Sequence, residues 1–258
     1  MDINSKDNNK SEYSSSEKTI EELLILEEAR KLKTVFLDNM SHELRTPITV
    51  ILGYAGILYE EIQDPELKEM AEIVLKSSNR LTESLNLLLD QSDVDSNRLK
   101  VAFEKKDLKL LLTEIYNIYK PIAEDKNLEI FFNTELNQAN SNIDVKMFNK
   151  VITNLLNNAV KFTEKGRIGL ELFSDNSNGT NFYCIKISDT GIGIPEEKRK
   201  LIFEAFRQVS EGMNRIYQGT GLGLSVSKKF VELMNGDITV ESEVNIGSKF
   251  TLKFPSIL

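Results

Sequence analysis

The chain lacks the features that mark secreted and membrane proteins. Cys184 is its only cysteine, which excludes an internal disulfide framework and fits a reducing compartment. This cysteine falls in the apolar run 182–187 and is predicted to be a small buried residue. No run approaches the ~18 consecutive apolar residues of a membrane helix, and no hydrophobic signal-peptide core follows the N-terminus. The sequence therefore predicts a cytoplasmic chain without a membrane span, either a whole protein or the cytoplasmic part of a longer one.

The chain also lacks an excess of positive charge. It has 32 Lys and Arg against 40 Asp and Glu, a net charge of -8. Binding to nucleic-acid phosphates needs clustered Lys and Arg, so no nucleic-acid partner is expected. The proportions of 40% apolar and 28% charged residues are typical of a soluble globular protein, and the length allows one large domain or two modest ones.

Glycine is nearly absent from the first part of the chain. Of thirteen glycines only Gly53 and Gly56 precede residue 166, so the front is predicted to be helical and the back rich in strands and turns. The polar, low-complexity start is predicted to be disordered. We expect a disordered head over residues 1–18, a helical hairpin over 19–97 and a second domain over 98–258.

Two apolar stripes at helical spacing predict the hairpin. The stripes are Met40, Leu44, Ile48, Ile51, Ala55, Leu58 and Ile62, and then Leu67, Met70, Val74, Ser77, Leu81, Leu85 and Leu88. Between them Asp64 is predicted to cap the second helix, with Pro65 at its first position. One hairpin cannot bury both stripes, so two copies are expected to pair into a four-helix bundle, which makes a homodimer the default.

The only histidine of the chain lies on the first helix. His42 is two residues from both Met40 and Leu44, and each helical residue turns by about 100°, so its side chain is predicted to point toward solvent. A solvated imidazole titrates near neutrality and is a nucleophile when neutral. Taken alone, an exposed histidine without a role is the commoner interpretation. Pro47 loosens the helical turn before it, which slightly favours a functional role for His42.

The segment "NLLNNAVKFT", residues 154–163, is predicted to form one helix with the preceding "NIDVKMFNKVI", and this helix carries a second group of polar side chains. Asn154, Asn158 and Lys161 follow one another at helical spacing beside an apolar stripe that runs from Phe148 to Phe162. Asparagine is a mediocre helix former, so two on one face need a reason. Amide oxygens suit Mg²⁺, and Lys161 one turn on suits a phosphate. By itself this pattern fits a polar helix face equally well.

Two glycine-rich loops indicate a nucleotide-binding site. In "KISDTGIGIP" a strand over residues 182–188 delivers Asp189 into a turn where its carboxylate can accept a hydrogen bond from an exocyclic amine, while Gly191 and Gly193 let a flat ring approach the backbone. In "GTGLGLSVSKKFVELMNG" a loop opens a helix and presents N–H groups to phosphates; Gly236 is predicted as its C′ residue. The loop fits neither the P-loop pattern nor G-x-G-x-x-G.

Taken in order, these segments resemble the catalytic core of a bacterial sensor histidine kinase over about residues 33 to 257. "SHELRTPI" is similar to the H box, "NLLNNAVKFT" to the N box, "DTGIGIP" to the first G box, "IFEAF" to the F box and "GTGLGL" to the second G box. Each motif alone is weak, but the ordered set is specific. The resemblance implies an α+β chain: a dimeric histidine-phosphotransfer hairpin, followed by an ATP-binding α/β sandwich of the gyrase, Hsp90, histidine kinase and MutL type.

The resemblance also implies roles for single residues. Asn158 would ligate Mg²⁺ with Asn154 beside it, Lys161 would contact phosphate, and Asp189 would bind the adenine amine. Arg207 is a candidate for the γ-phosphate, and residues 207–218 would form a lid over the nucleotide. The expected ATP site comprises Asn154, Asn158, Lys161, Asp189, Gly191, Gly193, Phe203, Arg207, Gly219, Thr220, Gly221, Leu222 and Gly223.

The activity implied is phosphoryl transfer from ATP to His42, with Glu43 orienting the proton of the imidazole, and then to an aspartate of a response regulator. Thr46 would position water for regulator dephosphorylation, as the H-E-x-x-T pattern implies; alternatively it only occupies the turn before Pro47. Two rivals remain. A gyrase-type ATPase would need a glutamate in the N-box helix, and a scaffold that binds ATP without transferring it would not need His42, Glu43 and Asn158 intact.

Overall fold

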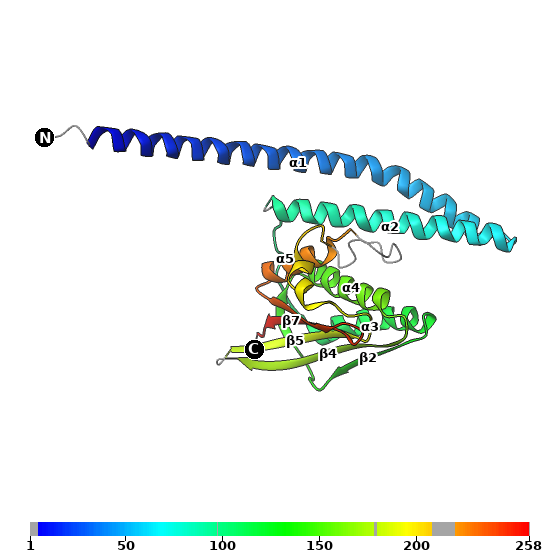
Figure 1. Ribbon diagram of the computed structural model, residues 1–258. Helices are drawn as coiled ribbons and strands as arrows, with labels where there is room; N and C mark the ends of the chain where they lie inside the picture. Colours follow the sequence, from blue (N-terminus) through cyan, green and yellow to red (C-terminus); the bar gives the residue numbers. More distant parts are fainter. Residues whose placement is uncertain (1–4, 97, 178–179, 208–219, 258) are drawn as a thin grey trace. The chain divides into compact units, whose positions relative to one another are not determined.

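The structure is a computed structural model that describes residues 5–96, 98–177, 180–207 and 220–257 (Figure 1). It divides into two compact units, Met1–Leu99 and Lys100–Leu258. The division lies close to the domain boundary that the sequence predicts after residue 97. Each unit is described by itself below.

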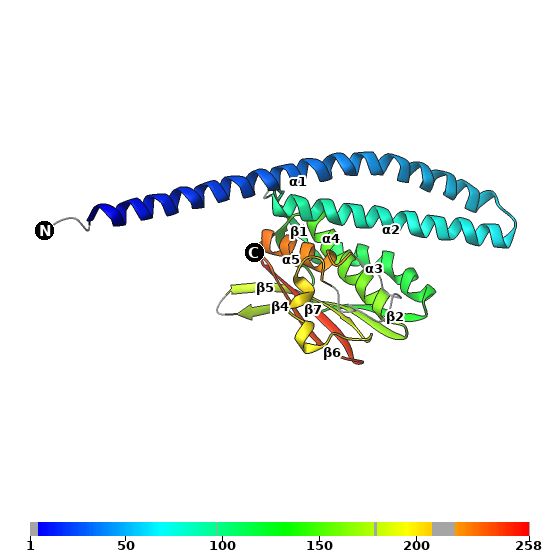
Figure 2. The same cartoon turned by 45° about the horizontal axis from the view of Figure 1, so that its top comes forward.

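The first unit is a helical hairpin, as predicted from the two stripes. Helix α1 (Ser5–Glu61) and helix α2 (Pro65–Asp95) run antiparallel and are joined by a short turn (Figure 2). The predicted cap is confirmed: Asp64 Oδ1 accepts hydrogen bonds from the N–H groups of Glu66 and Leu67 at 3.0 and 3.1 Å. Pro65 stands in the first turn of α2, where its missing N–H costs nothing.

The start of α1 differs from the sequence-based expectation. The helix begins at Ser5 and so includes most of residues 1–18, for which composition predicts disorder. The difference has a simple physical reason. The segment contains no glycine and no proline, so nothing in it stops a helix that is already formed downstream from continuing.

The buried seam of the hairpin coincides with the predicted apolar stripes only at Ile48, Ala55 and Leu85. The buried side chains repeat every seventh residue, which is the spacing of helices that pack along one seam. They are Thr34, Ser41, Ile48 and Ala55 on α1, and Ala71, Ser78, Leu85 and Ser92 on α2. The prediction that the stripes form the hairpin core is therefore only partly confirmed. Most of their large members stay exposed in the single chain: Met40, Leu44, Ile51, Leu58, Leu67, Met70, Val74 and Leu81.

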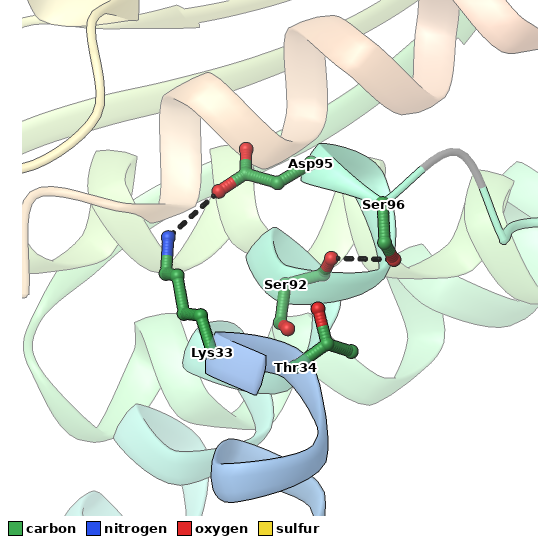
Figure 3. Close-up of a pocket in the computed structure, with 5 residues that line it drawn as sticks. All are labelled: Lys33, Thr34, Ser92, Asp95 and Ser96. Carbon is green, nitrogen blue, oxygen red and sulfur yellow. Dashed lines mark hydrogen bonds and ion pairs between the residues drawn. The ribbon is translucent and has the colours of Figure 1, made fainter. Parts of the chain in front are cut away.

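A small pocket lies at the open end of the hairpin. Its walls are Lys33, Thr34, Ser92, Asp95 and Ser96 (Figure 3). Lys33 Nζ lies 3.0 Å from Asp95 Oδ2, and Ser96 Oγ donates to the carbonyl oxygen of Ser92 at 2.8 Å. The sequence did not predict this pocket, and none of its walls belongs to the predicted nucleotide site.

The second unit is an α/β sandwich. Its main sheet has the order β2-β4-β5-β7-β6, in which β2 and β4 are parallel and the other neighbours antiparallel. A small antiparallel pair, β1 with β3, stands apart. Helices α3, α4 and α5 lie over one face of the main sheet (Figure 2). The elements are β1 (Glu104–Asp107), α3 (Leu108–Asp125), β2 (Leu128–Thr134), β3 (Asn140–Ile143), α4 (Val145–Phe162), β4 (Gly166–Ser177), β5 (Thr180–Asp189), η1 (Glu196–Lys198), η2 (Leu201–Phe203), α5 (Gly223–Leu233), β6 (Asp237–Glu243) and β7 (Gly247–Pro255).

The core of this unit lies between α4 and the sheet. Phe148 of α4 is fully buried, and its ring centroid is 5.7 Å from that of Phe254 on β7. The predicted stripe of this helix is confirmed from Phe148 to Ala159, whereas Phe162 is half-buried. Cys184 on β5 is fully buried, as predicted. The position of α4 is fixed at its start by Asp144, whose Oδ1 accepts from the N–H groups of the first turn.

The end of α5 corrects one prediction. Asn235, not Gly236, is the C′ residue with a positive φ, at 59°. The N–H of Asn235 donates to the carbonyl oxygen of Glu232, and the N–H of Gly236 donates to that of Val231. This is the Schellman arrangement, in which asparagine is a tolerated substitute for glycine.

Candidate active site

The histidine of the first unit is exposed to solvent on α1, as its spacing predicts. Glu43 beside it is exposed as well, whereas Ser41 on its other side is only 2% exposed. Thr46 lies one turn on, and its Oγ1 donates to the carbonyl oxygen of His42 over a long 3.4 Å. Pro47 interrupts the backbone ladder here, because it has no N–H to offer to Glu43. The three residues predicted to be catalytic are thus together on an accessible stretch of helix.

In the second unit Asp189 closes strand β5 as predicted. Its Oδ1 accepts the N–H of Gly191 at 2.9 Å. Burial raises the pKa of Asp189 above its ordinary value of 3.8, and hydrogen bonds from the backbone of Gly191 and Ser248 partly offset the rise. A half-buried carboxylate has about four acceptor sites, so these two backbone hydrogen bonds leave it able to accept another from a ligand.

The two glycines after Asp189 are required by close backbone approach. A Cβ at Gly191 would collide with the carbonyl oxygen of Phe162 at the end of α4. A Cβ at Gly193 would collide with the carbonyl oxygen of Glu243, and Gly193 also has a φ of 69°. The loop therefore packs directly on α4 and on the end of β6, without room for side chains.

Helix α4 and the start of α5 meet at Asn154. Its Nδ2 donates to Ser227 Oγ on α5 at 2.9 Å, and a Cβ at Gly223 would collide with its Oδ1. Gly223 is thus needed to bring the first turn of α5 against α4. Among the described residues no side chain caps that turn, so its N–H groups are suited to binding an anion. Sequence reasoning missed Ser227, because two elements far apart in the chain make this contact.

Asn158 differs from the two asparagines near it. Asn154 is held by Ser227, and Asn157 accepts a 2.7 Å hydrogen bond from the hydroxyl of Tyr119. Asn158 is half-buried, and in the described parts of the chain its amide has no hydrogen-bond partner. A neutral amide oxygen that the protein itself does not use is suited to a hard cation such as Mg²⁺.

Two lysines lie on the helices of this site, one at the end of α4 and one on α5. Lys161 Nζ is 4.9 Å from the ring centre of Phe162 at the end of α4. Lys228 Nζ of α5 lies 5.5 Å from the ring centre of Phe203, which contacts Phe250 edge-on. Lys228 was not predicted as a site residue; its only signal in the sequence is its place in the first turns after the glycine loop.

The second glycine loop is described only in part. The carbonyl oxygen of Gly221, at a φ of 70°, accepts the N–H of Phe206 at 3.0 Å, and Thr220 Oγ1 accepts the N–H of Leu222 at 3.3 Å. Arg207 is exposed and its Nε is 3.5 Å from Glu204 Oε2. Gly219 and residues 208–218 of the predicted lid lie outside the described residues.

Comparisons with known families cover both units. A family described as "His Kinase A (phospho-acceptor) domain" matches residues 32–97. A second, "Histidine kinase-, DNA gyrase B-, and HSP90-like ATPase", matches residues 143–257. Together the two matches take in more than half of the chain, and each falls on one of the two units.

Single relatives agree. The autoinducer 2 sensor kinase/phosphatase LuxQ of Vibrio cholerae is 35% identical over 230 residues, which cover 89% of this chain and 27% of LuxQ. Sensor histidine kinase RcsC of Salmonella typhimurium is 35% identical over 89% of this chain and 24% of its own length. The signal transduction histidine-protein kinase BarA of Escherichia coli is 35% identical over 226 residues, which cover 87% of this chain and 25% of BarA. The chain thus spans about a quarter of the length of these relatives.

Solved structures give the same result. The crystal structure of full-length ShkA in complex with AMPPNP has a TM-score of 0.69 and 27% identity, covering 85% of this chain and 45% of ShkA. The nucleotide-free catalytic domain of the histidine kinase ThkA has a TM-score of 0.51 and 28% identity, covering 60% of this chain and 97% of that domain. The predicted fold class, a helical hairpin followed by an ATP-binding sandwich, is confirmed.

Proposed function

Because the chain belongs to the histidine kinase family and carries its phospho-acceptor and ATPase domains, we propose that it transfers the γ-phosphoryl group of ATP to His42. The observation that carries this proposal is the pairing of two sites in one chain. One unit exposes a single histidine beside a carboxylate. The other joins the loop after Asp189 and the start of α5 to helix α4, which carries Asn158.

The chain's own residues have distinct tasks in this reaction. The neutral imidazole of His42 attacks through Nε2, and Glu43 accepts or orients the proton on Nδ1. Asp189 binds the exocyclic amine of adenine, and the uncapped N–H groups at the start of α5 receive phosphate oxygens. Lys161 and Arg207 add positive charge near the phosphates. Phosphoryl transfer depends mostly on such positioning and charge neutralisation.

The donor set fits Mg²⁺ through Asn158, whose amide has no partner in the described residues. Asn154 is fixed to Ser227 and so orients α5 against α4. The chemistry that Mg²⁺ would supply at Asn158 is positive charge, which would offset the negative charge that develops on the phosphoryl group during transfer. Incubation with γ-labelled ATP and Mg²⁺ tests the proposal, because a kinase of this type labels itself.

A gyrase-type ATPase is the weaker candidate. Such an enzyme needs a general base close to the γ-phosphate, expected as a glutamate in the N-box helix. Helix α4 has the sequence VKMFNKVITNLLNNAVKF and contains no acidic residue. Without a carboxylate to activate water in that helix, transfer to a histidine is the better supported reaction.

The acceptor after His42 is proposed to be an aspartate on the receiver domain of a response regulator, in the cytoplasm, where ATP and such regulators are present. Among the described helices none is long and apolar enough to cross a membrane. LuxQ, which carries both "kinase" and "phosphatase" in its name, motivates a second activity for this chain: removal of phosphate from the same regulator.

The exposed stripe of the hairpin supports a homodimer. Ile51 is 47% exposed and Leu81 52% exposed in the single chain, although both belong to regular apolar stripes. A second hairpin would cover them in a four-helix bundle. Replacing both with Glu should weaken dimerisation of the full chain by at least about 100-fold, because carboxylates would be buried without partners.

The matched control adds the same charge on polar, exposed positions of the same helices, Thr49→Glu with Asn79→Glu. Light scattering should find monomers for the stripe pair and dimers for the control, with equal helix content by circular dichroism. A dimer for both pairs would contradict the proposed interface. Leu85 is unsuitable for this test, because it is already buried within the hairpin.

Thr46 is proposed to position water for regulator dephosphorylation. Its hydroxyl is exposed and holds the His42 carbonyl only over 3.4 Å, so it is available to a second partner. Thr46→Ala should leave labelling of His42 intact and slow regulator dephosphorylation by about tenfold, the effect of one positioned hydrogen bond. Thr49→Ala is the control, since Thr49 makes the same type of bond, to Arg45, at 2.8 Å. Equal dephosphorylation rates in both variants would make Thr46 structural.

A further inference from the structure

The turn between β6 and β7 braces the loop that follows Asp189. Asn245 N–H donates to the carbonyl oxygen of Ile192 at 2.8 Å. Gly193 packs on the backbone of Glu243, and Gly247 packs on the backbone of Asp189 so closely that a Cβ at either glycine would collide. The loop is therefore held mainly by backbone contacts from one short segment, residues 242–248.

One side chain takes part in this brace. Ser242 Oγ accepts the N–H of Ile194 at 2.8 Å and donates to the carbonyl oxygen of Gly247 at 2.8 Å. Ser248 Oγ lies 3.0 Å from Ser242 Oγ. A serine hydroxyl has one proton, and that of Ser242 goes to Gly247, so Ser248 donates in this pair. The half-buried hydroxyl of Ser242 thus uses its proton and both of its lone pairs.

These hydrogen bonds involve residues on both sides of Asp189. Ser248 is its partner in the pairing of β5 with β7, and the backbone of Ser248 makes a hydrogen bond to the Asp189 carboxylate. Ile194 ends the glycine turn on the other side. Ser242 therefore ties the strand opposite Asp189 to the far end of its loop. The near end has its own tie, since Thr190 Oγ1 accepts the N–H of Arg167 at 3.0 Å.

We propose that Ser242 is a positioning residue that sets the selectivity of the site for adenine, an inference that rests on the proposed binding of ATP by Asp189. Ser242 would act through the loop and not through a contact of its own with the nucleotide, because its proton and lone pairs are used within the protein. Without its hydroxyl the N–H of Ile194 loses its partner, and the loop loses its only side-chain tie from β6 among the described residues. The carboxylate of Asp189 is then free to move away from the adenine amine, and the bond that distinguishes adenine from a base without that amine weakens.

The test compares dissociation constants of the full chain for ATP and ITP, because ITP carries an oxygen in place of the adenine amine. Ser242→Ala should reduce the preference for ATP over ITP by about fivefold to tenfold, the effect of one hydrogen bond, with ITP affinity nearly unchanged. Ser242→Thr keeps a hydroxyl and should restore the preference. Ser248→Ala removes one of the three bonds and should lower the preference by about twofold, which provides a second reading if Ser242→Ala folds poorly.

Thr239→Val is the matched control. Thr239 lies on the same strand, is exposed, and its hydroxyl makes only a 3.5 Å bond to Thr251 on β7, so the preference should not change. Equal losses of ATP and ITP affinity in Ser242→Ala would mean a general structural role and overturn the inference. The inference would also be overturned if Ser242→Ala and Ser248→Ala both kept the wild-type preference for ATP while Asp189→Asn abolished it. If Asp189→Asn keeps the preference, the proposed adenine contact itself is wrong and the role of Ser242 falls with it.

Discussion

Replacing His42 with Gln should abolish self-labelling of the protein by γ-labelled ATP, with a fall of more than about 100-fold, to background. Glutamine keeps a polar, helix-compatible side chain but has no nucleophilic nitrogen. His42 is exposed, so the change should leave the hairpin stable. It is also the only histidine of the chain, so no other imidazole can take over.

Two measurements accompany this result. The affinity of the His42→Gln variant for ATP should equal that of the wild type, because the ATP site lies in the other unit. Glu43→Gln should still label His42, only more slowly, since the carboxylate assists the proton and does not form the bond. Undiminished labelling of His42→Gln would place the phosphate elsewhere and refute the proposed chemistry.

Asp189→Asn should lower the affinity for ATP by about 10- to 100-fold, the cost of a hydrogen bond to a charged group. The amide oxygen of Asn can still accept the N–H of Gly191, so the loop should keep its shape. The loss then reports the ligand contact. Asp175→Asn is the matched control, because Asp175 is paired with Lys253 at 2.7 Å on the sheet and should not affect ATP.

The pH dependence of ATP affinity tests the same contact independently. Burial raises the pKa of Asp189, so its carboxylate takes up a proton at a pH above its ordinary range near 3.8. The ionised form is the one that accepts from the adenine amine. ATP affinity of the wild type should therefore fall as the pH drops through the raised pKa, and Asp189→Asn should lack this fall. The same pH profile for both proteins would exclude Asp189 as the adenine contact.

The sequence predicted those parts of the molecule that local patterns encode. The cap at Asp64, the exposure of His42 and the place of Asp189 at a strand end all follow from residues within one or two turns of each position. The five ordered boxes then linked the segments through the resemblance to sensor histidine kinases, and the family matches confirm that link.

Features that depend on contacts between distant segments escaped prediction. The hydrogen bond of Asn154 to Ser227 joins residues 73 positions apart, and that of Ser242 to Ile194 joins residues 48 apart. The sequence predicted the apolar stripes of the hairpin, but not that most of their large residues stay exposed while a neighbouring line of smaller residues forms the buried seam. Spacing alone does not distinguish packing within a hairpin from packing between two hairpins.

The most direct test of phosphoryl transfer to His42 is to locate the label on the wild-type protein. After incubation with γ-labelled ATP and Mg²⁺ the chain is digested, and the labelled peptide is sequenced and treated with acid and with base. A phosphohistidine mechanism predicts one labelled peptide that contains His42, with a phosphate lost in acid and stable in base. Label on a serine, threonine or tyrosine peptide, stable in acid, or steady ATP hydrolysis without any labelled peptide, would contradict the account.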